Sequence, residues 1–144
     1  MKIKEILIYI YQLPQNIIGK VIAKGSQVKS FKLENGKEIK VHFSNKVFGS
    51  GISLGNYIIL DPKYLTTTKS NLEETIKHEN GHQIQSLYLG WFYLIIVGIP
   101  SAINNLIDRL FHSKWSTNER LKWYFSRYPE NWADKLGGVS RNFK

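Results

Sequence analysis

Residues 70–89, SNLEETIKHENGHQIQSLYL, decide how this chain folds. Ser70 and Glu73 have the S-x-x-E spacing of a capping box, in which a hydroxyl and a carboxylate each accept a backbone N–H at the start of a helix. Gly90 follows the segment and is typical of the residue just past a helix end. The stretch therefore predicts one long helix that begins at Ser70 and ends near Leu89.

Residues 78–82, HENGH, form an H-E-x-x-H motif in the middle of this helix. His78 and His82 are four residues apart, so both imidazoles project from one helix face and can reach one metal ion. Glu79 faces the same cleft from another angle, where it can take a proton from a water activated by the metal. The chain has no cysteine, so the ligands must be imidazole and carboxylate, which suit zinc.

Gly81 is unfavourable in a helix interior, by about 1 kcal/mol relative to Ala. A packing reason is expected for a glycine at this position of the motif. A residue without a side chain lets another backbone approach closely. We therefore expect a second segment to lie directly against the ligand helix at Gly81.

A zinc site of this type needs a third protein ligand, and the chain offers three candidates. Glu130 is favoured, because it lies four residues before Asp134 on a helix expected to open at Pro129, which puts both carboxylates on one face. Glu130 would bind the ion, and Asp134 would accept the free ring N–H of a ligand histidine. His112 and Glu119 are the alternative third ligands.

If a metal-activated water attacks a carbonyl group, the site also requires a donor that stabilises the negative charge developing on the carbonyl oxygen. Four side chains in the C-terminal third could supply it, and the sequence does not choose among them. They are Tyr124, Tyr128, His112 and Arg141.

A small antiparallel sheet is expected ahead of the ligand helix. In residues 31–43, FKLENGKEIKVHF, apolar and polar residues alternate on both sides of Asn35-Gly36, which predicts a β-hairpin with a type I′ turn. Residues 51–60, GISLGNYIIL, predict a third strand. The edge of a sheet can accept a further extended chain as an added strand.

Two regions are strongly apolar. Residues 3–24 are interrupted by Pro14 and are interpreted as a packing or membrane-surface helix. They contain no clear cleavable signal peptide, because Glu5 interrupts the basic start and no small-x-small cleavage site follows. The second region, residues 87–107, carries no charge. Its densest part, residues 87–99, has a length more typical of a buried or interfacial element than of a membrane span.

The length of 144 residues fits one domain, residues 1–144. Further helices are expected at 101–111, 118–127 and 129–137. The formal net charge is +9. Residues 70–113 contain 2 basic and 4 acidic side chains, so the positive excess comes from the rest of the chain. Basic residues are mostly single lysines without runs, a pattern that argues against nucleic acid as a partner and is compatible with a membrane surface.

His78, His82, Glu130 and Asp134 together resemble the gluzincin class of zinc metallopeptidases, which is defined by H-E-x-x-H and a downstream E-x-x-x-D. The resemblance extends to small bacterial proteins with an HEYGH-type motif, in which Tyr often stands where this chain has Asn80. The similar segments are LPQN at 13–16, HENGHQIQS at 78–86, GIPS at 98–101 and WADKLGG at 132–138.

The resemblance implies a minimal zincin-like α+β domain with a Zn²⁺ site and zinc-dependent hydrolysis of a peptide or protein substrate. A cytoplasmic or membrane-associated location is favoured. The main alternative is a membrane-associated interaction protein that keeps a structural, non-catalytic zinc site. A basic nucleic-acid-binding module is a weaker alternative, because arginine and aromatic residues do not cluster in the chain.

Overall fold

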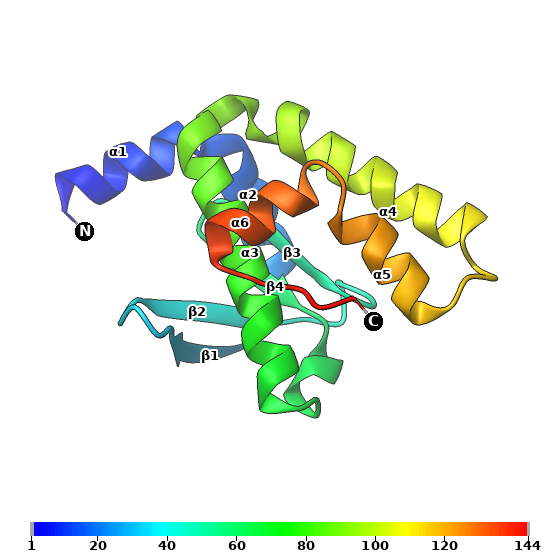
Figure 1. The fold of residues 1–144 in the computed structure, drawn as a ribbon. Coiled ribbons are helices and arrows are strands. Elements are labelled where there is room, and N and C mark those ends of the chain that lie inside the picture. The colour runs from blue at the N-terminus through cyan, green and yellow to red at the C-terminus, as the bar shows by residue number, and fades with distance from the viewer. Residues whose placement is uncertain (1, 144) are drawn as a thin grey trace.

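The computed structural model describes residues 2–143, in which all strands form one block between helices (Figure 1). The strands lie between two N-terminal helices and a longer helical half, which confirms the expected α+β class. In chain order the elements are α1 (Ile3–Tyr11), α2 (Leu13–Ala23), β1 (Gln27–Lys32), β2 (Glu38–Phe43), β3 (Gly51–Leu54), β4 (Tyr57–Leu60), α3 (Lys69–Leu89), α4 (Ile99–Phe111), α5 (Thr117–Phe125) and α6 (Glu130–Gly137). Short 3₁₀ helices at Pro62–Leu65 and Gly90–Phe92 and a π-helical turn at Leu94–Gly98 join them.

The sheet is mixed, with strand order β1-β2-β4-β3. The β1–β2 pair is antiparallel, as expected; β3 and β4 also pair antiparallel, but β2 and β4 run parallel. The expected single strand over 51–60 is two strands, because the chain reverses at Gly55, whose φ is +60°. The prediction of a wholly antiparallel sheet is therefore wrong at its centre, since β4 folds back between β2 and β3.

The predicted hairpin at Asn35-Gly36 joins β1 and β2, with Lys32 opposite Glu38. Its turn differs from the expected type I′, which needs two positive φ angles. Gly36 has φ +81°, and no residue other than glycine has a positive φ in residues 2–143. The N–H of Gly36 donates to Leu33 O (2.9 Å), so a longer connection forms the hairpin.

Helix α3 begins one residue earlier than predicted, at Lys69. Its N-cap is Thr68, whose extended backbone places Oγ1 to accept the N–H of Asn71 (3.3 Å). The predicted capping box of Ser70 and Glu73 is therefore wrong. Ser70 lies inside the first turn because Thr68 already occupies the capping position.

The core lies between the sheet and α3. Ile58 and Leu60 of β4 pack with Ile76 of α3. Helix α2 covers the opposite face of the sheet, where a Cβ built at Gly19 would lie 2.8 Å from Leu54 O. Strand β4 is therefore buried on both faces, and α3 is held firmly against the sheet.

Helices α3 and α6 cross in backbone contact. A Cβ at Gly81 would lie 1.9 Å from Ala133 O, and a Cβ at Gly137 would lie 2.0 Å from Lys77 O. This confirms the packing reason expected for Gly81. The crossing brings the middle of the ligand helix against the helix that carries Glu130 and Asp134.

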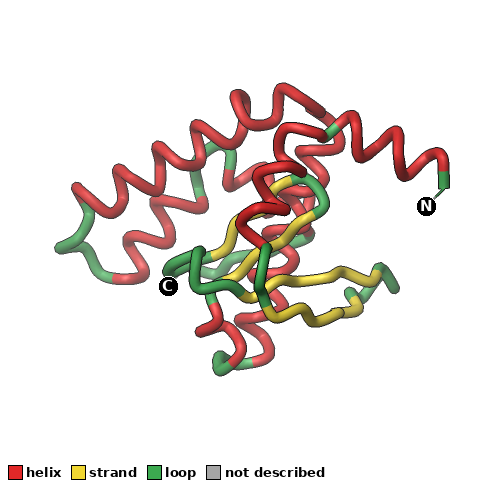
Figure 2. The backbone as a smooth tube through the Cα atoms, turned by 180° about the vertical axis from the view of Figure 1, so that it is seen from behind, coloured by secondary structure: helices red, strands yellow, loops and turns green. Residues whose placement is uncertain are grey.

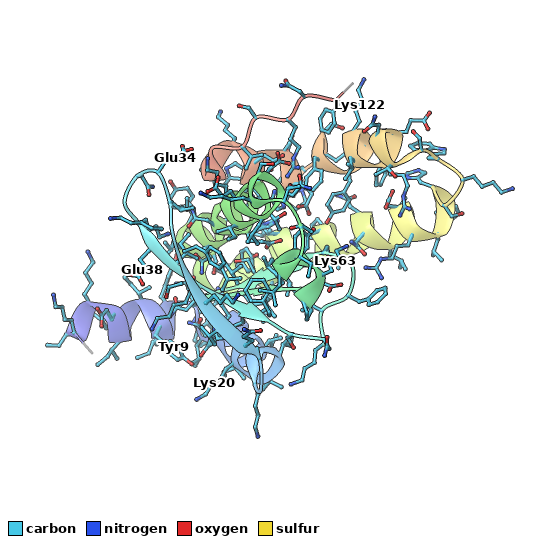
Figure 3. The ribbon with its side chains drawn as sticks, turned by 90° about the horizontal axis from the view of Figure 1, so that it is seen from below. Tyr9, Lys20, Glu34, Glu38, Lys63 and Lys122 are labelled. Atoms are coloured by element: carbon cyan, nitrogen blue, oxygen red, sulfur yellow. The ribbon has the colours of Figure 1, made fainter. Side chains whose placement is uncertain are left out.

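The helical half extends beyond the sheet on one edge of the molecule. Helix α1, the end of α3 and helix α4 run along the upper edge of Figure 1, and the view from behind in Figure 2 shows the same edge. Seen from below, α1 and α4 project on opposite sides of the body (Figure 3). Residues Leu94–Phe111 form an 18-residue helical segment that is long and apolar enough to cross a membrane, and α1 and α2 together pass the same test as a pair bent by 91°.

Candidate metal centre

Two elements distant in sequence bring His78, His82 and Glu130 together. The histidines lie one turn apart on α3, and Glu130 opens α6 at the helix crossing. His78 Nε2 and His82 Nε2 each lie 3.0 Å from the same atom, Glu130 Oε2. All three side chains are buried. This triad can hold a metal ion.

The outer ring nitrogen of each histidine has an oxygen partner. His78 Nδ1 lies 2.7 Å from Asp134 Oδ1, and His82 Nδ1 lies 2.7 Å from Gln85 Oε1. The amide of Gln85 is oriented by Pro129 O, which accepts from its Nε2 (3.1 Å). Both Nδ1 atoms therefore carry a proton and donate it. In a neutral imidazole this leaves Nε2 as a bare acceptor.

The two carboxylate oxygens of Glu130 have different partners. Oε1 accepts from the hydroxyls of Ser101, on α4, and Tyr124, on α5, with a distance of 3.1 Å from the tyrosine. Oε2 faces the two histidines. One carboxylate oxygen is thus held by the surrounding helices, while the other points into the centre of the triad.

The donor set fits a cation, because two imidazole acceptors and one carboxylate oxygen converge on the same point. Adjacent ligands of a tetrahedral zinc ion at about 2.0–2.1 Å are about 3.3 Å apart. The two Nε2–Oε2 separations of 3.0 Å are close to that value. Outer-sphere oxygens on both Nδ1 atoms are also typical of metal-binding histidines. The residues present therefore fit a metal ion held by two imidazoles and one carboxylate.

The charged groups of the triad shift the pKa values of one another. Burial alone lowers the pKa of His78, but hydrogen bonds to Asp134 and Glu130 outweigh it and raise the pKa to about 9. Burial alone raises the pKa of Glu130, but the two histidines outweigh it and hold the pKa below its usual value. The carboxylate is therefore ionised at neutral pH, and the centre of the triad favours a positive charge.

Glu79 lies beside the triad and is almost fully buried. Its Oε1 is close to strand β3, since a Cβ at Gly51 would lie 2.6 Å from it. Its Oε2 is buried and has no hydrogen-bond partner within residues 2–143. Burial is the main reason why the pKa of Glu79 is raised. The side chain is therefore suited to accept a proton.

A cleft of about 710 Å³ leads to these groups. Strand β3 forms one wall, and helices α4 and α5 contribute Ser101, Asn105 and Tyr124 to the other. His78, Glu79, His82 and Glu130 lie within it. The cleft therefore connects the predicted metal ligands, the predicted general base and an edge of the sheet.

The alternative third ligands lie elsewhere. His112 caps the C-terminal end of α4 and stacks on Trp115, with 3.7 Å between ring centroids. Glu119 caps the start of α5, where its Oε2 accepts from the Ser116 N–H (2.8 Å). Both carry out local structural roles, so the geometry favours Glu130 over either of them.

The predicted oxyanion donors lie in different places: His112 is at the end of α4, and the other three have different hydrogen-bond partners. Tyr124 contacts Glu130 in the cleft, whereas the Tyr128 hydroxyl donates to Ile96 O (2.5 Å). Arg141 reaches the cleft but its Nε donates to Asp134 Oδ2 (2.6 Å), so it orients the carboxylate that holds His78. Tyr124 is thus the one of these three that contacts the triad, and its hydroxyl is already engaged as a donor to Glu130 Oε1.

Sequence reasoning missed three contributors: Gln85, Ser101 and Tyr93. Gln85 follows His82 by three residues, and this helical spacing is a signal that could have found it. Ser101 reaches Glu130 from a different helix, so no local spacing reveals it. Tyr93 is buried and donates to Ser53 O on the cleft wall (2.9 Å). The contacts of Ser101 and Tyr93 depend on the tertiary arrangement.

Comparisons with protein-family models, with curated proteins and with solved structures found no match to this chain.

Proposed function

We propose that this protein is a zinc-dependent peptidase in which Glu79 is the general base. The observation that supports it best is the position of Glu79. Its carboxylate is buried beside the triad with one oxygen free of hydrogen bonds within the described chain, and it lines the same cleft. A structural metal site has no need of such a carboxylate, whereas a hydrolytic site does.

His78, His82 and Glu130 would hold the zinc ion, while Asp134 and Gln85 keep both histidines in the required tautomer. When bound, zinc supplies a Lewis acid that polarises a carbonyl group and lowers the pKa of a water molecule to about 7. Ser101 and Tyr124 hold the far oxygen of Glu130. The carboxylate is therefore preorganised to present a single oxygen.

Strand β3 offers an edge on which a peptide substrate can lie. Ser50 O accepts the N–H of Asp61 (3.0 Å), so residues 50 and 52 point their backbone groups towards β4. By alternation, Gly51 and Ser53 point theirs outwards, where Ser53 O already accepts from Tyr93. An extended peptide that pairs with this edge passes Glu79, because Gly51 lies against its carboxylate.

Glu79 carries both proton transfers of the reaction. Its free Oε2 accepts a proton from the attacking water as the new C–O bond forms. The same oxygen then donates the proton to the amine nitrogen as the peptide C–N bond breaks. Burial raises the pKa of Glu79, which brings it closer to the range in which a group can both accept and release a proton near neutral pH.

The test compares the wild type with Glu79→Gln, using metal analysis and the release of peptides from denatured casein. Glu79→Gln is expected to keep one zinc ion per chain and lose turnover by at least about a hundredfold. Glu73→Gln, an exposed glutamate on the same helix, is the matched control and should keep both properties. His82→Ala and Glu130→Ala should lose zinc.

A wild type without zinc would contradict the proposal. A Glu130→Ala protein with undiminished zinc affinity would contradict the ligand assignment. Equal turnover in Glu79→Gln and the wild type would contradict the role of Glu79.

A structural, non-catalytic metal site in a membrane-associated protein is the second candidate. The complete burial of Glu130 among Ser101, Tyr124 and the two histidines favours it, because the metal then ties α3, α4, α5 and α6 together. In that case removal of zinc unfolds the helical half, and Glu79→Gln has no effect on any function. Circular dichroism with and without a chelator distinguishes the two candidates.

A further inference from the structure

Helix α4 turns its apolar face away from the protein. Ile103, Leu106 and Leu110 lie on one helix face and are 50%, 56% and 63% exposed. The polar face points inwards: Asn104 Nδ2 donates to Tyr128 O (2.8 Å), and Asp108 pairs with Arg120 (2.7 Å). A surface helix of a protein surrounded by water shows the opposite arrangement.

The same edge of the molecule continues this exposed apolar surface. Helix α1 has no buried residue, and the segment between α3 and α4 also exposes large side chains. Both elements lie along the edge formed with α4 in Figures 1 and 2. We call this surface the apolar edge; its exposed members are Ile3, Ile6, Leu7, Ile10, Leu87, Tyr88, Trp91, Phe92, Ile95, Ile96, Ile99, Ile103, Leu106, Leu110 and Phe111.

Polar residues lie beneath the apolar edge. Gln12 and Gln15, at the junction of α1 and α2, are buried. Gln15 Nε2 donates to Ser86 Oγ (2.9 Å) and to Gly90 O (2.8 Å), and Ser86 Oγ donates to Gln12 Oε1 (2.6 Å). Polar side chains inside and apolar side chains outside indicate that this edge faces an apolar environment.

The charges and aromatic residues around the apolar edge fit a lipid surface. Lys2 and Lys4 lie at its α1 end, and Lys114 follows α4 at the other end. Trp91 and Trp115 are exposed, at the α3–α4 connection and after α4. Tryptophan is enriched at membrane interfaces, and lysine is attracted to anionic headgroups.

The polar contacts of α4 decide how it meets a membrane. They run along the helix from Ser101 to Arg109, whose guanidinium donates to Phe48 O (3.3 Å). A spanning helix would have to leave these partners and enter lipid on all sides. A helix with one face on protein and the other in lipid lies flat in one leaflet.

We propose that the apolar edge docks on an anionic lipid bilayer, with α1, the α3–α4 connection and α4 lying in the plane of one leaflet. The same helix α4 lines the cleft with its inner face. The outer face of α4 therefore belongs to the docking surface, and its inner face belongs to the cleft that holds the metal centre.

The test is flotation of the purified full-length protein with vesicles of phosphatidylcholine, with and without phosphatidylglycerol. Binding is expected with both and should be tighter when phosphatidylglycerol is present. Ile103→Asn should weaken it about tenfold, which corresponds to about 1.4 kcal/mol. Val28→Asn is the matched control, since Val28 is equally exposed on β1, away from the apolar edge, and it should bind like the wild type.

Leu106→Asn is the second variant in case Ile103→Asn fails to fold, and circular dichroism checks both. Quenching of tryptophan fluorescence by bromine-labelled lipid acyl chains adds a direct measurement and should occur in the wild type. Absence of binding to either vesicle would overturn the proposal. So would equal loss in Ile103→Asn and Val28→Asn, or binding that high salt abolishes and Ile103→Asn leaves unchanged. A dimer that depends on Ile103 and does not bind vesicles would overturn the proposal and assign the apolar edge to a second copy of the chain.

Discussion

Replacing Gly81 by alanine tests how the two halves of the metal centre are held together. The new Cβ would lie 1.9 Å from Ala133 O and 2.6 Å from Ala133 C, whereas real Cβ contacts are essentially never shorter than 3.0 Å. Both atoms belong to the backbone of α6 and cannot rotate away. Helix α6 must therefore move by about 1 Å, and it carries Glu130 and Asp134 with it.

The size of the effect follows from two opposing contributions. Overpacking against rigid backbone costs about 3 kcal/mol, at the upper end of the usual range. Alanine is a better helix former than glycine and returns about 1 kcal/mol. The free energy of unfolding should therefore fall by about 2 kcal/mol, which lowers Tm by about 4–8 °C for a chain of this size.

Metal affinity should fall as well. If α6 moves by about 1 Å, the hydrogen bond of 2.7 Å from His78 to Asp134 becomes too long, and so does the 3.0 Å separation of the two metal-facing atoms His78 Nε2 and Glu130 Oε2. Thermal unfolding followed by circular dichroism measures the first effect, and zinc competition with a chromophoric chelator measures the second. A Gly81→Ala protein as stable as the wild type with equal zinc affinity would refute the reasoning.

Gly98→Ala is the control for this experiment. Gly98 is also helical, but the nearest atom to its built Cβ is 3.6 Å away, at a flexible leucine end. The substitution should leave zinc affinity unchanged and raise stability by up to about 1 kcal/mol.

Three further predictions concern the surroundings of the triad. Gln85→Leu removes the acceptor of His82 Nδ1 and should weaken zinc binding about 10–100-fold in chelator competition; unchanged affinity would mean that the tautomer of His82 is held in another way. Ser101→Ala should lower the unfolding free energy by about 1 kcal/mol in urea titrations, whereas Ser126→Ala, at an exposed hydroxyl, should change it by less than about 0.5 kcal/mol; equal effects would contradict a role for Ser101. In the metal-free protein the pKa of His78 is raised to about 9, so its stabilising contribution is present below its ordinary value of about 6.5 and is lost as pH rises through 9. Urea unfolding in a chelator should show this fall, and a flat profile from pH 6.5 to 9 would contradict it.

The sequence allowed much of the ligand helix to be predicted, because its signals are local. His78 and His82 share a face through helical periodicity alone, and Gly81 is costly enough in a helix to require a neighbouring backbone. The start of the helix was less predictable. Two capping residues, Thr68 and Ser70, lie within three positions, and the backbone conformation of Thr68 decided between them.

The strand pairing of the sheet could be predicted only in part from local sequence signals. The turn at Asn35-Gly36 predicted its hairpin, whereas segment 51–60 was predicted as one strand although Gly55-Asn56, a dipeptide typical of a tight turn, divides its apolar residues. The parallel pairing of β2 with β4 involves strands separated by β3 in the chain. No turn sequence specifies such a pairing, since it results from packing against α2 and α3.

The sequence by itself determined the chemistry that this protein has available: two histidines and a glutamate in fixed register on one helix, and carboxylates four residues apart on another. The tertiary structure alone decided which carboxylate meets the histidines and which faces of α1 and α4 remain outside. The physical reason is that helical register follows from backbone periodicity within a few residues. The position of Glu130 depends on a crossing between helices about fifty residues apart, which two glycines permit.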